Sequence, residues 1–147
     1  MEKACDAAVQ KFNDLSDRTK AANARMKAIS ELQKHIGTYS KTRDIYIQYR
    51  KLMGKKQAEF YERHTSEINA CQAAKRYFDS LGLKKLPSIQ SLKQEYATLA
   101  AENKRRYPKQ KRAREKMIEL LTAKNNVERI LGVAEKEKNR NRQQETR

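Results

Sequence analysis

Apolar residues recur along the first stretch of the chain, roughly residues 2–36, at alternating intervals of three and four positions. This is the spacing of a coiled-coil seam, the line of side chains that a helix turns toward a partner helix. The seam positions are Cys5, Ala8, Phe12, Leu15, Thr19, Ala22, Met26, Ile29, Gln33 and Ile36. Because the apolar stripe is narrow, such a helix needs a partner along its length.

The same spacing returns over residues 88–131 and predicts a second long helix. Its middle seam positions, Asn103, Arg106 and Gln110, are polar, and Pro108 lies among them. Since a proline inside a helix removes a hydrogen bond, we expect a kink there, or a break that starts a separate helix near residue 109. The seam positions are Ile89, Leu92, Tyr96, Leu99, Asn103, Arg106, Gln110, Ala113, Met117, Leu120, Lys124, Val127 and Leu131.

Two shorter helices are expected between the long ones. Gly37 predicts the end of the first long helix, because glycine readily takes the left-handed conformation that ends many helices. A helix over residues 39–53 then ends at Gly54. Another follows over residues 57–81, broken near Thr65-Ser66, where a hydroxyl can cap a new start.

Two further glycines predict helix ends. Gly82 is followed by Leu83, an order typical of the Schellman motif, in which Leu83 packs back on Phe78. Gly132 ends the last helix. The charged stretch 134–147 after it is expected to be a disordered tail.

These elements predict an all-α fold: an elongated antiparallel coiled coil of two long helices, with a small helical bundle at one end. Residues 1–133 are expected to form a single helical domain. If the two long helices did not pair within one chain, they would pair between chains, so a homodimer through the first helix is a second possibility.

The charge of the chain indicates which kinds of partner it binds. The 147 residues include 34 Lys and Arg against 18 Asp and Glu, for a formal net charge of +16. This excess is typical of proteins that bind a polyanion such as DNA, RNA or an acidic protein surface. The alternative is that Lys and Arg only solvate the helix faces.

The sequence offers little to suggest an enzyme. His35 and His64 form no metal-binding pattern, the glycines form no phosphate-binding loop, and Cys5 and Cys71 fit no CxxC pair. We therefore expect no catalytic residue, no cofactor and no metal, and read both cysteines as buried, reduced residues of a cytoplasmic bacterial protein. The charged N-terminus and the lack of a long apolar run predict neither a signal peptide nor a membrane span.

The most suggestive stretch for binding is KRRYPKQKRAREK, residues 104–116, where eight basic residues stand against Glu115. A basic helix can follow a phosphate backbone, and Tyr107 can stack on a base. The alternative is a solvated turn of a coiled coil. The candidate nucleic-acid-binding residues are Lys104, Arg105, Arg106, Tyr107, Lys109, Lys111, Arg112 and Arg114.

A second candidate set interleaves basic and aromatic residues over residues 41–51. It comprises Lys41, Arg43, Arg50 and Lys51, beside Tyr46 and Tyr49, which are more typical of core positions. Neither set has the spacing of a helix-turn-helix or a zinc finger, so we expect binding without sequence preference.

The wording of several segments is similar to the C-terminal helical region of relaxases, the mobilization nucleases of conjugative elements, in particular those of Gram-positive gut bacteria. The segments are FNDLSDRTKAANARM, TRDIYIQYRK, FDSLGLKKLPSIQSLKQEYATL and ELLTAKNNVERILG, and the likeness covers about residues 2–133. The resemblance implies a part in DNA transfer. The catalytic tyrosine and histidine cluster of relaxases belong to a separate N-terminal domain and match nothing here.

Three functions therefore stay open. The first is a non-catalytic accessory domain of a relaxase that binds single-stranded or duplex DNA, docks other transfer proteins, or does both. The second is a coiled-coil interaction module that acts alone. The third is a small mobile-element inhibitor that binds a nuclease. The basic charge favours the first independently of the resemblance.

Overall fold

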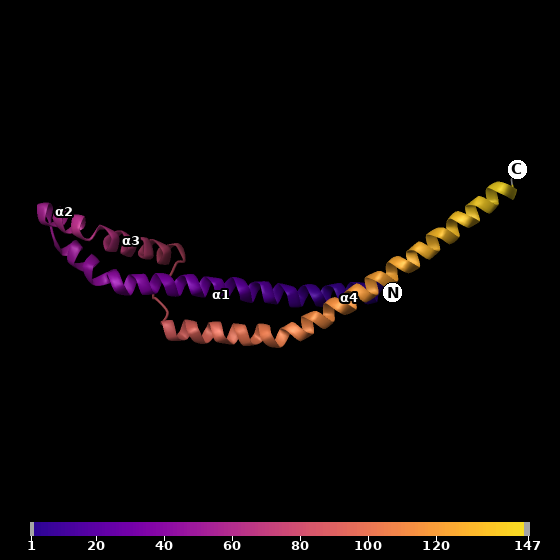
Figure 1. Cartoon of the computed structure of the whole chain (residues 1–147), viewed down its shortest axis with the longest axis horizontal. Coiled ribbons are helices and arrows are strands. Elements are labelled where there is room, and N and C mark those ends of the chain that lie inside the picture. Colours follow the sequence, from indigo (N-terminus) through magenta and orange to yellow (C-terminus); the bar gives the residue numbers. More distant parts are fainter. Residues whose placement is uncertain (1, 146–147) are drawn as a thin grey trace. The chain divides into compact units, whose positions relative to one another are not determined.

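The computed structural model describes residues 2–145, all of which belong to four helices or the short links between them (Figure 1). The two long helices, α1 (Glu2–Lys51) and α4 (Ile89–Glu145), pack antiparallel. The two shorter ones, α2 (Gly54–Arg63) and α3 (Thr65–Ser80), lie between them in the sequence. The prediction of an all-α fold built on two antiparallel long helices is confirmed.

The chain divides into two compact units, where the sequence favoured one domain. Unit 1 is Met1–Ala22 with Ala101–Arg147, and unit 2 is Asn23–Ala100. Each unit contains a stretch of α1 and a stretch of α4. The N-terminal methionine and the end of the predicted tail, residues 146 and 147, lie outside the described residues.

The core of unit 2 is built by three helices. α1 contributes three residues, of which Ile29 and Ile36 are predicted seam positions and Leu32 is not; α3 contributes two, and α4 contributes one. Because the side chains come from three sides, several of them lose all contact with water. The core residues are Ile29, Leu32, Ile36, Ala74, Phe78 and Leu92, with Tyr39, Tyr77, Leu83, Leu86 and Leu99 packed against them.

Unit 1 consists of one helix pair. Cys5 on α1 donates its S–H to the carbonyl of Leu120 on α4 at 3.3 Å, and Thr19 lies opposite Gln110. All ten predicted seam positions of α1, counted over both units, are buried or half-buried, which confirms the seam. Because α4 of the same chain fills this seam, a homodimer through it would require the two helices to separate.

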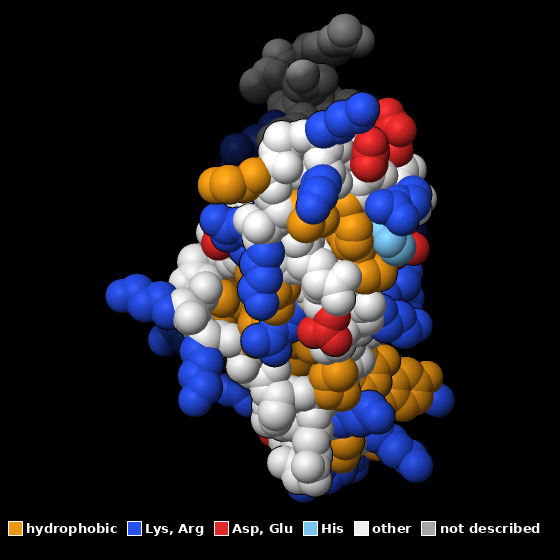
Figure 2. Space-filling view, turned by 90° about the vertical axis from the view of Figure 1, so that its left-hand side faces the viewer, with side chains coloured by type: hydrophobic (Ala, Val, Ile, Leu, Met, Phe, Trp, Pro, Cys, Tyr) orange, Lys and Arg blue, Asp and Glu red, His pale blue; other side chains and the backbone are white. Residues whose placement is uncertain are grey.

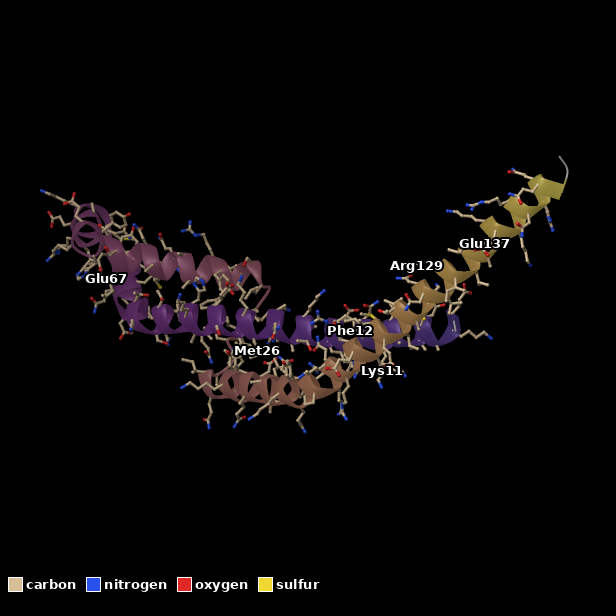
Figure 3. The ribbon with its side chains drawn as sticks, turned by 45° about the vertical axis from the view of Figure 1, so that its right-hand side comes forward. Lys11, Phe12, Met26, Glu67, Arg129 and Glu137 are labelled. Carbon is tan, nitrogen blue, oxygen red and sulfur yellow. The ribbon has the colours of Figure 1, made fainter. Side chains whose placement is uncertain are left out.

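α4 continues beyond the part that pairs with α1 in unit 1. Figure 3 labels Arg129 and Glu137 on this stretch, along which no other helix of unit 1 runs. Its apolar side chains are exposed, Ile130 at 67% and Leu131 at 58%. Of the predicted seam of α4, Leu92 and the positions from Leu99 to Lys124 are buried or half-buried, whereas Ile89, Tyr96, Val127 and Leu131 are exposed.

The predicted end of the first helix at Gly37 is wrong, and so is a separate helix over residues 39–53. α1 runs through Gly37 to Lys51. The reason is packing beyond the glycine: the Tyr39 ring meets Phe78 edge to face, with centroids 5.8 Å apart. A glycine inside a helix costs only about 1 kcal/mol, less than the loss of such a packed aromatic would cost.

α4 also continues where the sequence suggested interruption. It is one helix through Pro108, so the predicted break near residue 109 is excluded. It also continues through Gly132 to Glu145, so the expected end at Gly132 is wrong, and the tail from residue 134 is helical as far as Glu145. The side chains from 133 to 144 are exposed, as expected of a charged segment.

The short helices follow the sequence more closely. The break expected near Thr65 is present, between α2 and α3, but the Thr65 hydroxyl donates back to the Tyr61 carbonyl at 2.6 Å and does not cap α3. After α3, Gly82 has a φ of 68°, and the N–H of Leu83 donates to the carbonyl of Phe78 at 3.2 Å. This is the predicted Schellman ending.

Candidate nucleic-acid interface

The basic run on α4 divides into two flanks when it is placed on a helix with 100° between residues. The two flanks lie on either side of the seam, and Glu115 lies between them on the side of α4 opposite the seam. The groove flank comprises Arg105, Lys109, Arg112 and Lys116, and the outer flank comprises Lys104, Lys111 and Arg114 together with Tyr107. All eight side chains are exposed, Tyr107 at 67%.

Arg106 lies in the seam, unlike the other residues of the basic run that were predicted to bind phosphates. Its Nη1 donates to Oδ1 of Asn103 at 2.8 Å and to Oγ1 of Thr19 at 3.4 Å. The guanidinium is thus held between α1 and α4. We assign Arg106 to the helix pair, and the other basic residues of the run to the surface.

Arg106 belongs to a polar layer that joins both helices of unit 1. Thr19 donates to Oε1 of Gln110 at 3.0 Å, and Nε2 of Gln110 donates to Oγ of Ser16 at 3.3 Å. The polar seam residues of unit 1 therefore lie opposite each other. Polar groups at such positions fix the register of a coiled coil, because any shift would leave them without partners.

An open groove runs along unit 1 beside this layer, with a volume of about 690 Å³. Small and apolar side chains form its floor, and cations from both helices form its rims. We name it the unit 1 groove. It is lined by Ala8, Lys11 and Leu15 of α1 and by Lys109, Arg112, Ala113 and Lys116 of α4.

Lys11, labelled in Figure 3 beside the seam residue Phe12, is the groove residue that the sequence analysis did not single out. A signal for it exists in the sequence. Aligning the polar exceptions of the two seams in antiparallel order places Phe12 opposite Ala113. This alignment brings Lys11 to the groove flank of α4 and adds a cation from the second helix.

The second candidate set lies in unit 2. Lys41, Arg43, Arg50 and Lys51 are exposed on α1. Figure 2 views the side on which α2 and α3 lie, where Lys and Arg side chains are spread over the surface and Asp and Glu occur in few places. This distribution is compatible with contact to a polyanion.

The aromatic rings of this second set already pack against other side chains of the protein. Lys75 Nζ lies 4.9 Å from the centroid of the Tyr46 ring, and the Arg50 guanidinium lies 6.0 Å from it. Tyr49 packs against Tyr61, with centroids 5.9 Å apart. Both rings have partners inside the protein, so Tyr107 on α4 is the better placed ring for stacking on a base.

An exposed ion pair joins α1 and α4 within unit 2. Arg25 Nε and Nη2 donate to the two carboxylate oxygens of Glu95 at 2.7 and 3.0 Å. These hydrogen bonds hold the pKa of Glu95 below its usual range and raise that of Arg25. The bidentate geometry agrees with the antiparallel register of this unit and adds a small contribution to it, since both side chains are exposed.

The histidines have structural surroundings. His35 stacks on Tyr77 with centroids 3.9 Å apart, and His64 packs against Phe60 at 4.5 Å. His35 lies inside α1, because this helix continues past Gly37. Cys5 and Cys71 are free and buried, as predicted.

Among residues 2–145, no three His, Cys, Asp or Glu side chains come together in a way that could hold a metal ion. Within the same residues, no helix is long and apolar enough to cross a membrane.

Comparisons with known proteins gave no relatives. A scan against protein-family models found no match to the chain. Searches of curated proteins and of solved structures found no similar protein either. The resemblance to relaxases therefore stays a prediction from the wording of the sequence.

Proposed function

We propose that this protein is a non-catalytic nucleic-acid-binding module that contacts the phosphate backbone through α4. The observation that carries the proposal is the exposure of seven cations within residues 104–116, on both flanks of one continuous helix. Each Lys or Arg that neutralises a phosphate releases a bound counterion, which favours binding of any sequence. Tyr107, beside the outer flank, adds a ring on which an unpaired base can stack.

The resemblance to relaxases suggests the setting of this activity. In that setting the chain acts as an accessory element that holds DNA during conjugative transfer while a separate domain cuts it. The support for the setting is the wording of the segments quoted above. The support for nucleic-acid binding, in contrast, is the charge and exposure of α4, and it stands without the resemblance.

Protein docking is the second candidate function, and one observation favours it. The C-terminal stretch of α4 exposes four apolar residues, Val127, Ile130, Leu131 and Val133. A group of exposed apolar side chains is typical of a protein-binding surface. In a relaxase, such a surface would serve to bind other transfer proteins. It would equally serve an adaptor or a nuclease inhibitor.

The test is binding of labelled single-stranded and duplex DNA by fluorescence anisotropy over a salt series. One variant carries Lys104→Gln, Lys111→Gln and Arg114→Gln, and a control variant carries Lys136→Gln, Lys138→Gln and Arg140→Gln. Both remove three exposed charges from α4. If the basic run binds phosphates, the first variant loses affinity and its salt slope falls by about 2 to 3, whereas the control changes little.

Two results would count against this proposal. If the two variants lose affinity equally, only the net charge of the chain attracts DNA, and the basic run is not an interface. If the unaltered protein does not bind DNA at low salt, the nucleic-acid function is wrong. A preference for single strands would support the stacking role of Tyr107, which Tyr107→Leu then tests directly.

A further inference from the structure

The unit 1 groove combines an apolar floor with cationic rims, whereas a site for a phosphate backbone requires only the cations. Its floor is apolar, formed by Ala8, Leu15 and Ala113, and its rims carry four cations and no carboxylate. An occupant that fits must offer an apolar surface to the floor and negative charges to both rims. The floor has no aromatic side chain on which a base could stack, so a nucleic acid would leave it without a partner.

The rims fit a helix. Lys109, Arg112 and Lys116 follow each other at intervals of three and four residues, so they lie on one side of α4 over two turns, about 10 Å. Lys11 lies on the opposite rim, on α1. A helix that lies between two antiparallel helices places its apolar stripe on the floor and its flanking side chains at the rims.

Unit 2 shows what such a third helix does in this chain. There, α3 packs against α1 and contributes Ala74 and Phe78 to the core that α1 and α4 share. Unit 1 has the same two long helices but no third one among the described residues. The small side chains of Ala8 and Ala113 in its groove leave space for a helix backbone to approach closely.

We propose that the unit 1 groove is a docking site for an acidic amphipathic helix of another protein. The partner helix would lay leucine-like side chains along the floor and turn Asp or Glu toward Lys11 on one side and Lys109, Arg112 and Lys116 on the other. This site uses Lys109, Arg112 and Lys116, which are also among the seven cations counted for DNA binding, but it leaves the outer flank free. Docking of a helix therefore does not depend on DNA binding.

The test uses a synthetic peptide of about 18 residues, long enough for five helical turns. It carries leucines at seam spacing with glutamates on either side, and its binding to the full chain is measured by fluorescence anisotropy. A permuted peptide of the same composition, in which the leucines no longer share a face, is the matched ligand control. A short single-stranded oligonucleotide of similar charge is the second ligand.

Two double variants complete the design. The groove variant carries Lys109→Gln and Lys116→Gln, and the outer variant carries Lys104→Gln and Lys111→Gln. Each removes two exposed charges from the same stretch of α4. We expect the groove variant to bind the amphipathic peptide about tenfold more weakly and the outer variant less than about threefold more weakly. Lys11→Gln should also weaken binding, because its cation comes from the other rim.

Several results would overturn the proposal. If the permuted peptide binds as tightly, the chain only attracts anions. If both double variants lose the same affinity for the peptide, the groove is not the site. If the peptide does not bind at low salt and the groove variant instead weakens the oligonucleotide more than the outer variant does, the groove takes nucleic acid. Circular dichroism of each variant checks that helix content is unchanged.

Discussion

Unit 2 and unit 1 use the same two long helices but bury them in different ways. In unit 2, α3 joins them, and Ile29, Ile68, Cys71 and Ala74 are completely buried. In unit 1, no third helix is described, and the seam buries mainly small side chains together with a layer of hydrogen-bonded polar ones. The difference teaches that a third element decides whether a narrow apolar stripe becomes a closed core.

This difference also separates stability from binding. Unit 2 closes a core around Ile29 with its own residues, although an open groove of about 820 Å³ lies beside that core, lined among others by Leu32, Leu83 and Leu86. Unit 1 keeps an open groove and most of the basic run exposed, so a partner can still add contacts there. We therefore expect substitutions in unit 2 to act mainly on folding, and substitutions on the surface of unit 1 to act mainly on binding.

The largest expected effect comes from emptying the closed core. Ile29→Ala removes a completely buried side chain of unit 2 and should lower the free energy of unfolding by about 2 to 5 kcal/mol. Leu120→Ala, at a half-buried seam position of unit 1, should cost only about 1 kcal/mol. Urea denaturation followed by circular dichroism measures both. Equal losses would mean that the two units are equally well packed.

A smaller effect is expected from the polar layer of unit 1. Thr19→Val keeps the shape of the side chain but removes the hydroxyl that bonds Gln110 and Arg106, at a cost of about 1 to 3 kcal/mol. In the Thr19→Val variant, hydrogen exchange should become faster in residues 2–22 and 101–120 than in the unaltered protein, and should change less in unit 2. Uniformly faster exchange would show that the units do not open separately.

The smallest effect concerns the ion pair of unit 2. Because the folded state lowers the pKa of Glu95, the pair stabilises the protein above the ordinary carboxyl pKa and loses this contribution as the pH falls through the lowered value. Both side chains are substantially exposed, so Glu95→Gln should cost under about 1 kcal/mol at about pH 7 and nothing once the pH lies below the lowered pKa of Glu95. A cost that persists in acid would trace the effect to packing.

Much of this architecture follows from the sequence. The alternation of three and four residues predicted two long helices, and all ten seam positions that it named on α1 are covered, although it missed the buried Leu32 and Thr42 and the stretch of α1 beyond residue 36. Local signals placed the Schellman ending at Gly82 and the start of α4 after Ser88, whose hydroxyl accepts the Ser91 N–H at 3.1 Å. These features depend only on residues close together in the chain.

The errors arose where distant residues decide. Gly37 and Gly132 look like helix ends in isolation, yet both lie inside helices. In the first case Tyr39 reaches Phe78 on α3, and that contact outweighs the modest cost of the glycine. Pro108 costs α4 one hydrogen bond, which a long helix supported on both sides of the proline tolerates.

The candidate site shows the same division. The sequence by itself determined that α4 carries a dense basic run and that the fold is helical, because composition and periodicity are local properties. The periodicity already placed Arg106 at a seam position, but only the tertiary structure gave its guanidinium the partners Asn103 and Thr19. The tertiary structure also brought Lys11 and Arg112 to one groove and left a hollow over Ala8 and Ala113. These outcomes depend on the register of two helices about 90 residues apart in the chain, which polar contacts between them fix.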